Sequence, residues 1–292
     1  MPADTEARSL NVTLAGLDAL ELAAGEQEGR LRRVWRSAWP KVAAIALAIG
    51  VWQLVTWSGW KPKFVLAPPS EAFRELWALL RDGTLTTAAR ITLWRAAVGF
   101  SLSMVIGVVV GSLVARVKLV RAAVGSLITG IQTMPSVAWV PFAIVIFRRD
   151  YESAILFVMV LGAAPAIANG LITGTDHIPP ILLRAGRVLG ARGFAAYRHI
   201  ILPAALPSFV GGVKQGWAFL WRSLMAAELI AVVPGKPSVG FLLQLNRELA
   251  NSAGLIATMI VILVIGIAVD SLVFGTLDRA IRRRWGLLES TR

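Results

Sequence analysis

The sequence predicts an all-α membrane protein with about six transmembrane helices. Of its 292 residues, 56% are hydrophobic, and the mean hydropathy of +0.67 is far above that of soluble domains. A helix crosses about 30 Å of hydrocarbon with roughly 20 residues, so the chain has room for several spans. Cysteine is absent, which leaves neither a disulfide framework nor a thiol site to consider.

Six apolar segments are the candidate spans. Tryptophans bracket the first of them, as expected at a membrane–water interface, and basic residues precede it, separate the second from the third and follow the sixth. Because Lys and Arg accumulate in cytoplasmic loops, both termini are predicted to be cytoplasmic. The same bias explains the net charge of +13 without nucleic-acid binding. The segments are residues 38–57, 93–115, 122–147, 153–174, 206–233 and 254–277.

We divide the chain into a cytoplasmic N-terminal tail, residues 1–37, a membrane domain, residues 38–285, and a short C-terminal tail, residues 286–292. The polar lead does not have the form of a cleavable signal peptide, so we expect it to be retained. Its leucines fall at near-helical spacing, which fits either an amphipathic helix on membrane lipids or a partly ordered tail. Residues 71–81 have one apolar helical face and Ser70 as a potential cap, which predicts an interfacial helix on the outer surface; a plain extramembrane hairpin is the alternative.

Several kinds of chemistry are excluded by motifs that the sequence lacks. It has no Gly-x-x-x-x-Gly-Lys-Ser/Thr loop to hold ATP phosphates, so energy for active transport must come from another chain. It has no Gly-x-Ser-x-Gly elbow and no His-Glu-x-x-His motif, which argues against a membrane-embedded hydrolase. His177 and His199 lie far apart with no cysteine or carboxylate cluster, so a metal site is not expected. The chain is therefore predicted not to be an enzyme.

Two charged residues lie inside the fifth apolar segment, Arg222 and Glu228. An unpaired charge at mid-membrane costs about 2.5 kcal/mol or more, so each must be paired or hydrated. Their separation of six positions places them on different helix faces, so each needs water or a partner on another element. Arg222 fits either attraction of an anion along a path or an inter-helix ion pair.

Prolines interrupt the third segment, in the stretch from Gln132 to Pro141 that also contains Pro135. Backbone carbonyls freed by a proline need new partners, which is typical of a bundle interior or a water-lined path. A translocation path and a simple packing kink are both consistent with this stretch. Small residues at Gly107, Gly111 and between Gly125 and Gly130 predict close helix–helix approach.

The most informative stretch is an arginine-bearing interruption at residues 184–203. Gly190 allows a bend, and Phe194 and Tyr197, one helical turn apart, offer apolar knobs. Exposed aromatics among arginines are typical of a protein-docking patch, although an amphipathic helix on anionic lipid headgroups has the same pattern. The surrounding arginines are Arg187, Arg192 and Arg198.

The spacing of this stretch resembles the signature loop of bacterial ABC-importer permeases: Glu-Ala-Ala, three residues, Gly, nine residues, Ile, one residue, Leu-Pro. The match includes Gly190, Ile200 and the Leu-Pro ending at Pro203, whereas Arg184 stands in place of Glu and Gly186 in place of the second Ala. From about residue 60 to 285 the chain is similar to permeases for nitrate, sulfonate, taurine or bicarbonate-type anions. The similarity includes the Thr-Leu-Trp-Arg stretch at residues 92–95, the proline-bearing segment and the Trp…Ala-Glu segment that ends at Glu228.

The resemblance implies a type I ABC importer permease architecture with a cytoplasmic coupling helix, in the cytoplasmic membrane of a bacterium. It implies a homodimer, two ABC ATPase subunits that bind ATP and magnesium, and an extracytoplasmic solute-binding protein that delivers a small anionic solute. It favours a path role for Gln132, Pro135 and Pro141, and a structural or gating role for Glu228. A secondary transporter or channel is the rival function, but the inverted repeats that would favour it are not evident. The residues implied in coupling to the ATPase are Arg184, Ala185, Gly186, Arg187, Gly190, Phe194, Tyr197, Arg198 and Pro203.

Overall fold

The computed structural model describes residues 30–148 and 150–284, and all the regular elements in these two ranges are helical. The chain divides into two compact units, one ending at Pro62 and the other beginning at Lys63. The helix of the first unit is α2, Arg30–Trp57. The second unit contains α3 (Pro69–Arg81), α4 (Thr84–Arg116), α5 (Lys118–Thr133), η1 (Ser136–Ala138), α6 (Trp139–Phe147), α7 (Tyr151–Asp176), α8 (Pro180–Val188), α9 (Gly193–Ala196), η2 (Tyr197–Ile201), α10 (Leu202–Ile230), α11 (Val239–Glu248), α12 (Ser252–Val269), η3 (Asp270–Phe274) and α13 (Gly275–Arg284).

Four of the expected spans are confirmed as long apolar helices. They lie in Ala38–Trp57, Thr84–Arg116, Tyr151–Asp176 and Ser252–Ile281. The last of these runs through α12, one π-helical turn and α13. The fifth expected span is the 29-residue α10, which is long enough to cross a membrane but less apolar than these four, because Lys214, Gln215, Arg222 and Glu228 lie within it.

The third expected segment is interrupted, as its prolines predict. The segment forms two helical pieces, Leu119–Thr133 and Ser136–Phe147, bent by 95° from each other. Met134 and Pro135 have extended backbone angles at the bend, since a proline disfavours helical geometry in the residue before it. Pro141 does not contribute to the bend, because it lies in the first turn of α6, where a missing N–H is tolerated.

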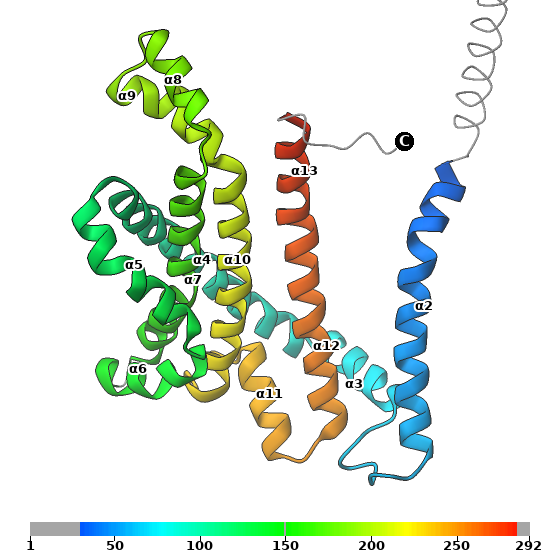
Figure 1. Cartoon of the computed structure of the whole chain (residues 1–292). Coiled ribbons are helices and arrows are strands. Elements are labelled where there is room, and N and C mark those ends of the chain that lie inside the picture. The colour runs from blue at the N-terminus through cyan, green and yellow to red at the C-terminus, as the bar shows by residue number, and fades with distance from the viewer. Residues whose placement is uncertain (1–29, 149, 285–292) are drawn as a thin grey trace, which may run out of the picture. The chain divides into compact units, whose positions relative to one another are not determined.

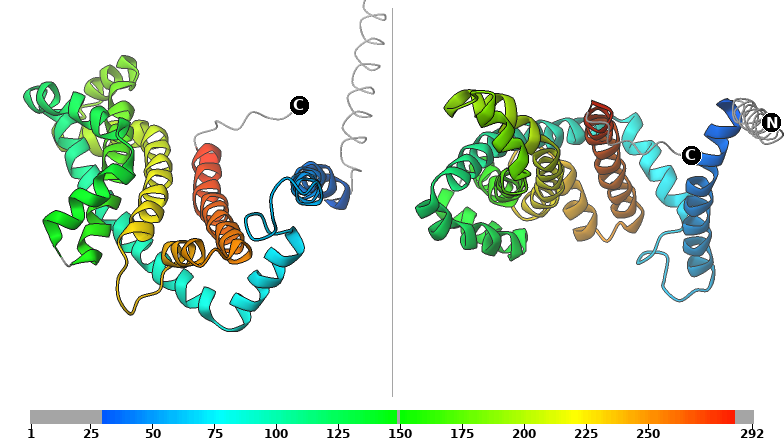
Figure 2. Two further views of the ribbon diagram at one scale, coloured as in Figure 1. Left: turned by 90° about the horizontal axis from the view of Figure 1, so that it is seen from below. Right: turned by 45° about the horizontal axis from the view of Figure 1, so that its top comes forward.

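Helix α7 is the centre of the second unit. It packs between α10 and α4, as Figures 1 and 2 show. Its apolar side chains Ile155, Met159 and Ile167 are fully buried, and they share one core with Leu220 and Leu224 of α10. An aromatic group made by Phe100, Trp217 and Phe274 fixes the last helix on this core, with ring centroids 5.5 to 6.0 Å apart.

Small residues let these helices approach closely, as the sequence predicts for Gly107 and Gly111. Each of these two glycines faces the backbone of α7, with no room for a side chain. The tightest crossing joins Gly170 of α7 and Gly212 of α10, where an added Cβ would lie 2.5 Å from the opposite Cα. Gly125 and Gly130 differ from this pattern, because nothing within the chain lies near them.

Two helix starts show how local sequence sets the element boundaries. The predicted interfacial helix is present as α3, but Ser70 is not its cap; Pro68 holds that position and Pro69 begins the helix. Helix α7 is capped by Asp150, which accepts hydrogen bonds from the backbone N–H and the hydroxyl of Ser153. These bonds hold the pKa of the Asp150 carboxyl below its ordinary value. The expectations for the tails at residues 1–29 and 286–292 lie outside the described residues.

The Gly170–Gly212 crossing yields a test of core packing. We expect Gly170→Ala to lower the stability of the protein by about 1–3 kcal/mol, because the new methyl group meets backbone that cannot move aside. Gly125→Ala is the matched control and should leave the stability unchanged, since its Cβ enters open space. The measurement is the midpoint of thermal unfolding in detergent. Equal midpoints for the two variants would contradict the close approach.

Candidate functional site

Glu228 of α10 is held in a fully buried polar site. Its side chain is 1% exposed and accepts a 2.8 Å hydrogen bond from Nη1 of Arg95 in α4. The hydroxyl of Thr92 donates to it at 2.9 Å, and the backbone N–H of Gly240 donates at 3.1 Å. Glu228 therefore has its partners on other elements, as the charge pattern of the sequence requires.

Arg95 joins this site to a second carboxylate. Its Nε and Nη2 atoms donate to the two oxygens of Glu152, at the start of α7, over 2.9 and 2.8 Å. Lys236 also donates to Glu152, at 3.1 Å. The two cations balance the two carboxylates, so four charges occupy one neutral cluster. Such pairing is what makes ionised groups tolerable in a membrane-spanning fold.

The same cluster fixes the turn between α10 and α11. The hydroxyl of Thr92 accepts a 3.0 Å hydrogen bond from the backbone N–H of Val239. Gly240 lies directly against the side chain of Glu228, and a Cβ at this position would overlap it. Helices α4, α7 and α10 and the beginning of α11 are thereby tied together at one point. This geometry fits the structural or gating role expected for Glu228, which stays a prediction.

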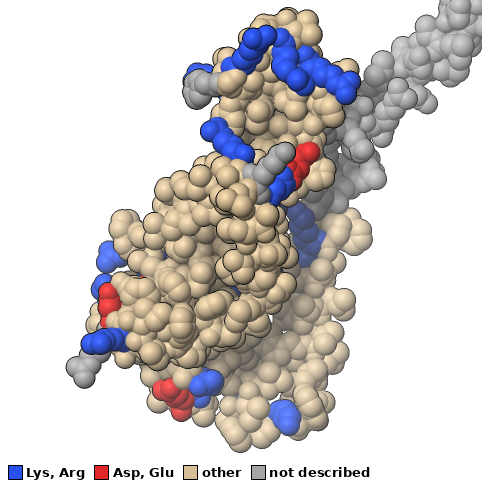
Figure 3. Space-filling model, turned by 60° about the vertical axis from the view of Figure 1, so that its left-hand side comes forward, with Lys and Arg blue, Asp and Glu red and all other residues tan. Residues whose placement is uncertain are grey.

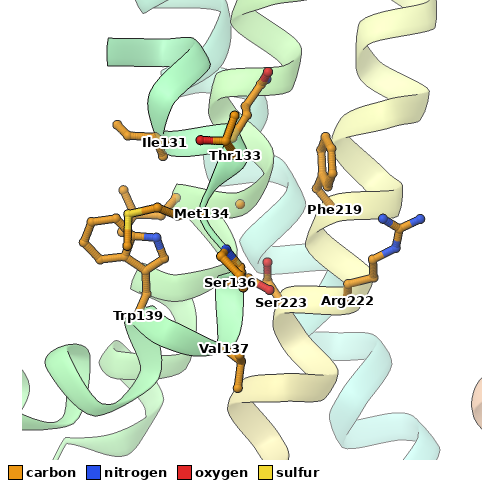
Figure 4. A pocket seen from close by; sticks show the side chains of 13 residues that line it. Ile131, Thr133, Met134, Ser136, Val137, Trp139, Phe219, Arg222 and Ser223 are labelled. Atoms are coloured by element: carbon orange, nitrogen blue, oxygen red, sulfur yellow. The ribbon is translucent and has the colours of Figure 1, made fainter.

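A cavity of about 300 Å³ lies beside the bend between α5 and α6. It brings together three of the residues expected in a path, Gln132, Pro135 and Arg222, whereas Pro141 and Glu228 lie elsewhere. Figure 4 shows Ser223 extending from α10 toward Ser136 of the bend, with the guanidinium of Arg222 beside Phe219. Arg222 is exposed, and its guanidinium carbon lies 5.8 Å from the centroid of the Phe219 ring. Within the described part of the chain Arg222 makes no ion pair, so the inter-helix pair is not found there.

The loop at residues 184–203 projects from the ends of α7 and α10 and carries α8 and α9 (Figure 1). Its most exposed apolar side chains are Val188 and Leu189, at 87% and 85%. Gly190 and Gly193 follow with φ of +83° and +54°, a backbone region that glycine adopts without strain. Exposed arginines surround the apolar pair, and Figure 3 shows basic residues gathered over this end: Arg184, Arg187, Arg192 and Arg198.

Of the two aromatic knobs expected in this loop, Tyr197 is placed differently. Tyr197 is half-buried, and its ring lies 4.3 Å from the guanidinium carbon of Arg116 at the end of α4. The side chain of Phe194 lies outside the described residues. Gly186 is buried because Ile200 of the signature spacing packs against it, while Ala185 is exposed and Pro203 lies in the first turn of α10. The exposed apolar contact is thus made by Val188 and Leu189.

The family model for "Binding-protein-dependent transport system inner membrane component" matches residues 103–283. The chain belongs to this family. It is a permease component of an ABC transporter, as the signature spacing predicts. The matched residues include Glu228 of the buried cluster, the lining of the cavity and the projecting loop. They do not include Thr92 and Arg95, which lie before residue 103.

Curated relatives align over most of this permease. The taurine transport system permease protein TauC of Escherichia coli is 29% identical over 87% of this chain and 92% of its own length. SsuC of the same organism, named for aliphatic sulfonates transport, is 30% identical over 76% and 83%. The nitrate import permease protein NrtB of Leptolyngbya laminosa is 26% identical over 82% and 86%.

Solved structures support the fold of the permease. A chain of the inward-facing MetNI methionine ABC transporter superposes with a TM-score of 0.57 at 21% identity, covering 70% of this chain and 96% of that one. At this identity the likeness concerns the fold. The predicted all-α, type I ABC importer permease architecture is confirmed.

Three residues of the permease's polar sites were not identified from the sequence: Arg95 as a buried cation, Glu152 and Ser223. Arg95 falls just inside the expected span 93–115, so its need for a partner could have been noticed. Glu152 lies at a helix start, where acidic residues are ordinary, and gives no local signal. Ser223 is inconspicuous because serine is common between packed membrane helices.

The buried cluster predicts unequal effects of removing its charges. Arg95→Gln should destabilise the permease by about 3–5 kcal/mol, because Glu228 is left buried without its cation. Glu228→Gln should cost less, since Arg95 keeps both bonds to Glu152. Thermal unfolding in detergent measures both, with the exposed Arg90→Gln as the charge-matched control on α4. If Arg95→Gln unfolds at the temperature of Arg90→Gln, the cluster does not stabilise the fold.

The two glycines of the signature loop should respond differently to alanine. Gly190→Ala places a side chain at φ +83° and should strain the loop by about 1–2 kcal/mol, lowering solute uptake while the level of folded protein is kept. Gly186→Ala restores the residue usual in relatives, and only the terminal methyl group of Ile200 must move, so uptake should be unchanged. Uptake per folded permease checks both variants. Equal uptake by Gly190→Ala and the wild type would show that the left-handed turn is not needed.

Proposed function

We propose that this permease forms the translocation path of an ATP-driven importer for a small anionic solute. It acts as a homodimer with two ATPase subunits and an extracytoplasmic solute-binding protein. The observation that carries the proposal is the projecting loop, which combines the signature spacing with an exposed apolar pair among arginines. The names of the relatives, for taurine, sulfonates and nitrate, support an oxoanion as the solute class.

The coupling step assigned to this loop is mechanical. Because the sequence contains no Walker loop, ATP and magnesium bind to the partner subunits. Val188 and Leu189 supply the apolar centre and the arginines the polar rim of a docking surface, which is the usual anatomy of a protein interface. The loop connects α7 directly to α10, so movement of a docked ATPase is transmitted to the helix that lines the cavity.

The proposed orientation places this loop in the cytoplasm of a bacterium, together with both termini. At this end of the helices lie Arg116, which ends α4, and an ion pair between Arg121 in the first turn of α5 and Asp176, which ends α7. Basic residues at one end of the membrane helices support a cytoplasmic location for that end. Arg184 in place of the usual glutamate makes the docking surface more basic, so a more acidic groove is expected on the ATPase.

The coupling proposal is tested by placing charges on the apolar pair. The double variant Val188→Asp, Leu189→Asp should lose the ATPase subunits on purification and lower solute uptake at least tenfold, because the docking centre becomes polar. The measurements are the ATPase-to-permease ratio after affinity purification and uptake into proteoliposomes. Leu249→Asp, at an exposed apolar position on the turn before α12, is the control and should retain the ATPase. A double variant that keeps both the ATPase and full uptake would show that Val188 and Leu189 are not the docking centre, whereas full uptake after loss of the ATPase would indicate an ATPase-independent transporter or channel.

A further inference from the structure

We propose that the cavity at the α5–α6 bend is an oxoanion subsite, with Arg222 providing the charge and Ser223 and Gln132 providing hydrogen bonds. The inference rests on the proposed transport of an anion and adds the place where the anion is held. The ligand class is a monoanion with several oxygen acceptors, such as nitrate or a short alkanesulfonate. A cavity of about 300 Å³ has room for such an ion with part of its water.

The first support is an uncompensated charge. Other charges on the packed helices are neutralised, as in the buried Arg95 cluster and in the half-exposed 3.3 Å pair of Lys214 with Asp270. Arg222 makes no ion pair with any described residue, and the lining of its cavity contains no Asp or Glu. Arg222 therefore gives the cavity a positive charge. Helix α10, which carries Arg222, belongs to the membrane domain. A site of this kind attracts and holds an anion.

The second support is an unpartnered hydroxyl. Ser223 is fully buried, and within the described residues its Oγ has no hydrogen-bond partner. Gly162 of α7 makes room for this hydroxyl, because a Cβ there would overlap it. A buried hydroxyl without a partner is unfavourable unless a ligand or water supplies one. Ser223 and Ser136 both line the cavity, and Figure 4 shows them on the sides of α10 and of the bend that face each other.

The bend itself favours the same ligand. Interrupted helices expose polar backbone where they line a cavity, and the N-terminal ends of the pieces favour anions. The break at Met134 and Pro135 lies in the cavity lining, and so does Trp139, the first residue of the nine-residue α6. Gln132, before the break, adds an amide that can donate to an oxyanion.

A route to the cavity runs along α10. Its exposed side is formed by small or polar residues at helical spacing, over about 20 Å, and it begins at the end that carries the projecting loop. A membrane helix surface without bulky apolar side chains is suited to a hydrated path more than to lipid. Arg222 lies where this stripe meets the cavity. The stripe is Ser208, Gly211, Gln215, Ala218 and Arg222.

The subsite is tested by anion-dependent stabilisation of the permease–ATPase complex in detergent. Ligand binding raises the midpoint of thermal unfolding, and nitrate and methanesulfonate are the probes, compared with bulky gluconate at equal sodium concentration. We expect both probes to raise the midpoint for the wild type, no shift for Arg222→Gln, and at least half of the wild-type shift for Arg222→Lys. Ser223→Ala removes one hydroxyl oxygen and should weaken the apparent affinity for nitrate and methanesulfonate three- to tenfold. Arg74→Gln, an exposed arginine of α3 that does not line the cavity, is the charge-matched control and should shift like the wild type.

Two outcomes overturn the subsite: no probe-dependent shift in the wild type, or the same shift in Arg222→Gln as in the wild type. The Arg222→Lys and Ser223→Ala variants keep the test decisive if Arg222→Gln does not fold. The binding measurement requires no transport, so it is independent of the coupling test with Val188 and Leu189. Full uptake after loss of the ATPase, with intact anion binding, would contradict the proposed importer and leave the subsite standing. ATPase-coupled uptake without anion binding would support the proposed importer and overturn the subsite.

Discussion

Charge neutralisation away from water is the constraint on which this fold depends. Arg95 spans the two carboxylates Glu152 and Glu228, and in doing so it joins α4, α7 and α10 at one buried point. An isolated charge there would be prohibitively costly, so these helices are fixed in one relative register. The close glycine contacts of α7 with α4 and α10 depend on that register, because a shift of one helical turn would replace glycine with side chains that do not fit.

We assign function to the sites where charged, polar or apolar groups lack such partners. Arg222 and Ser223 line a cavity, and among the described residues Arg222 has no ion pair and the Ser223 hydroxyl has no hydrogen-bond partner. Val188 and Leu189 are apolar and fully open among arginines. Unsatisfied groups of both kinds are unfavourable in the isolated chain and become favourable when an ion or a second protein covers them. Val188 and Leu189 lie in the loop that leads into α10, and α10 carries Arg222 and Ser223 of the cavity.

Much of this arrangement follows from local sequence, and its failures have physical causes. The apolar runs give the spans, and the loop spacing gives the family. The interruption of the third segment was predicted but its angle was not, because a proline in an apolar run is compatible with a mild kink as well as with two helices at 95°. Tyr197 was expected to be exposed, but helical spacing does not reveal that Arg116 of another helix lies over its ring.

The sequence by itself determined that the chain is an all-helical membrane permease, where its apolar helices run and where the signature loop lies, because these depend on hydropathy and spacing along the chain. It also required that Glu228 find a partner elsewhere. Only the tertiary structure decided that the partner is Arg95, that Arg222 meets Gln132 at a cavity, and that Ser223 is left unpaired. Such pairings join residues far apart in the chain, and the geometry that selects among them exists only once the helices have packed.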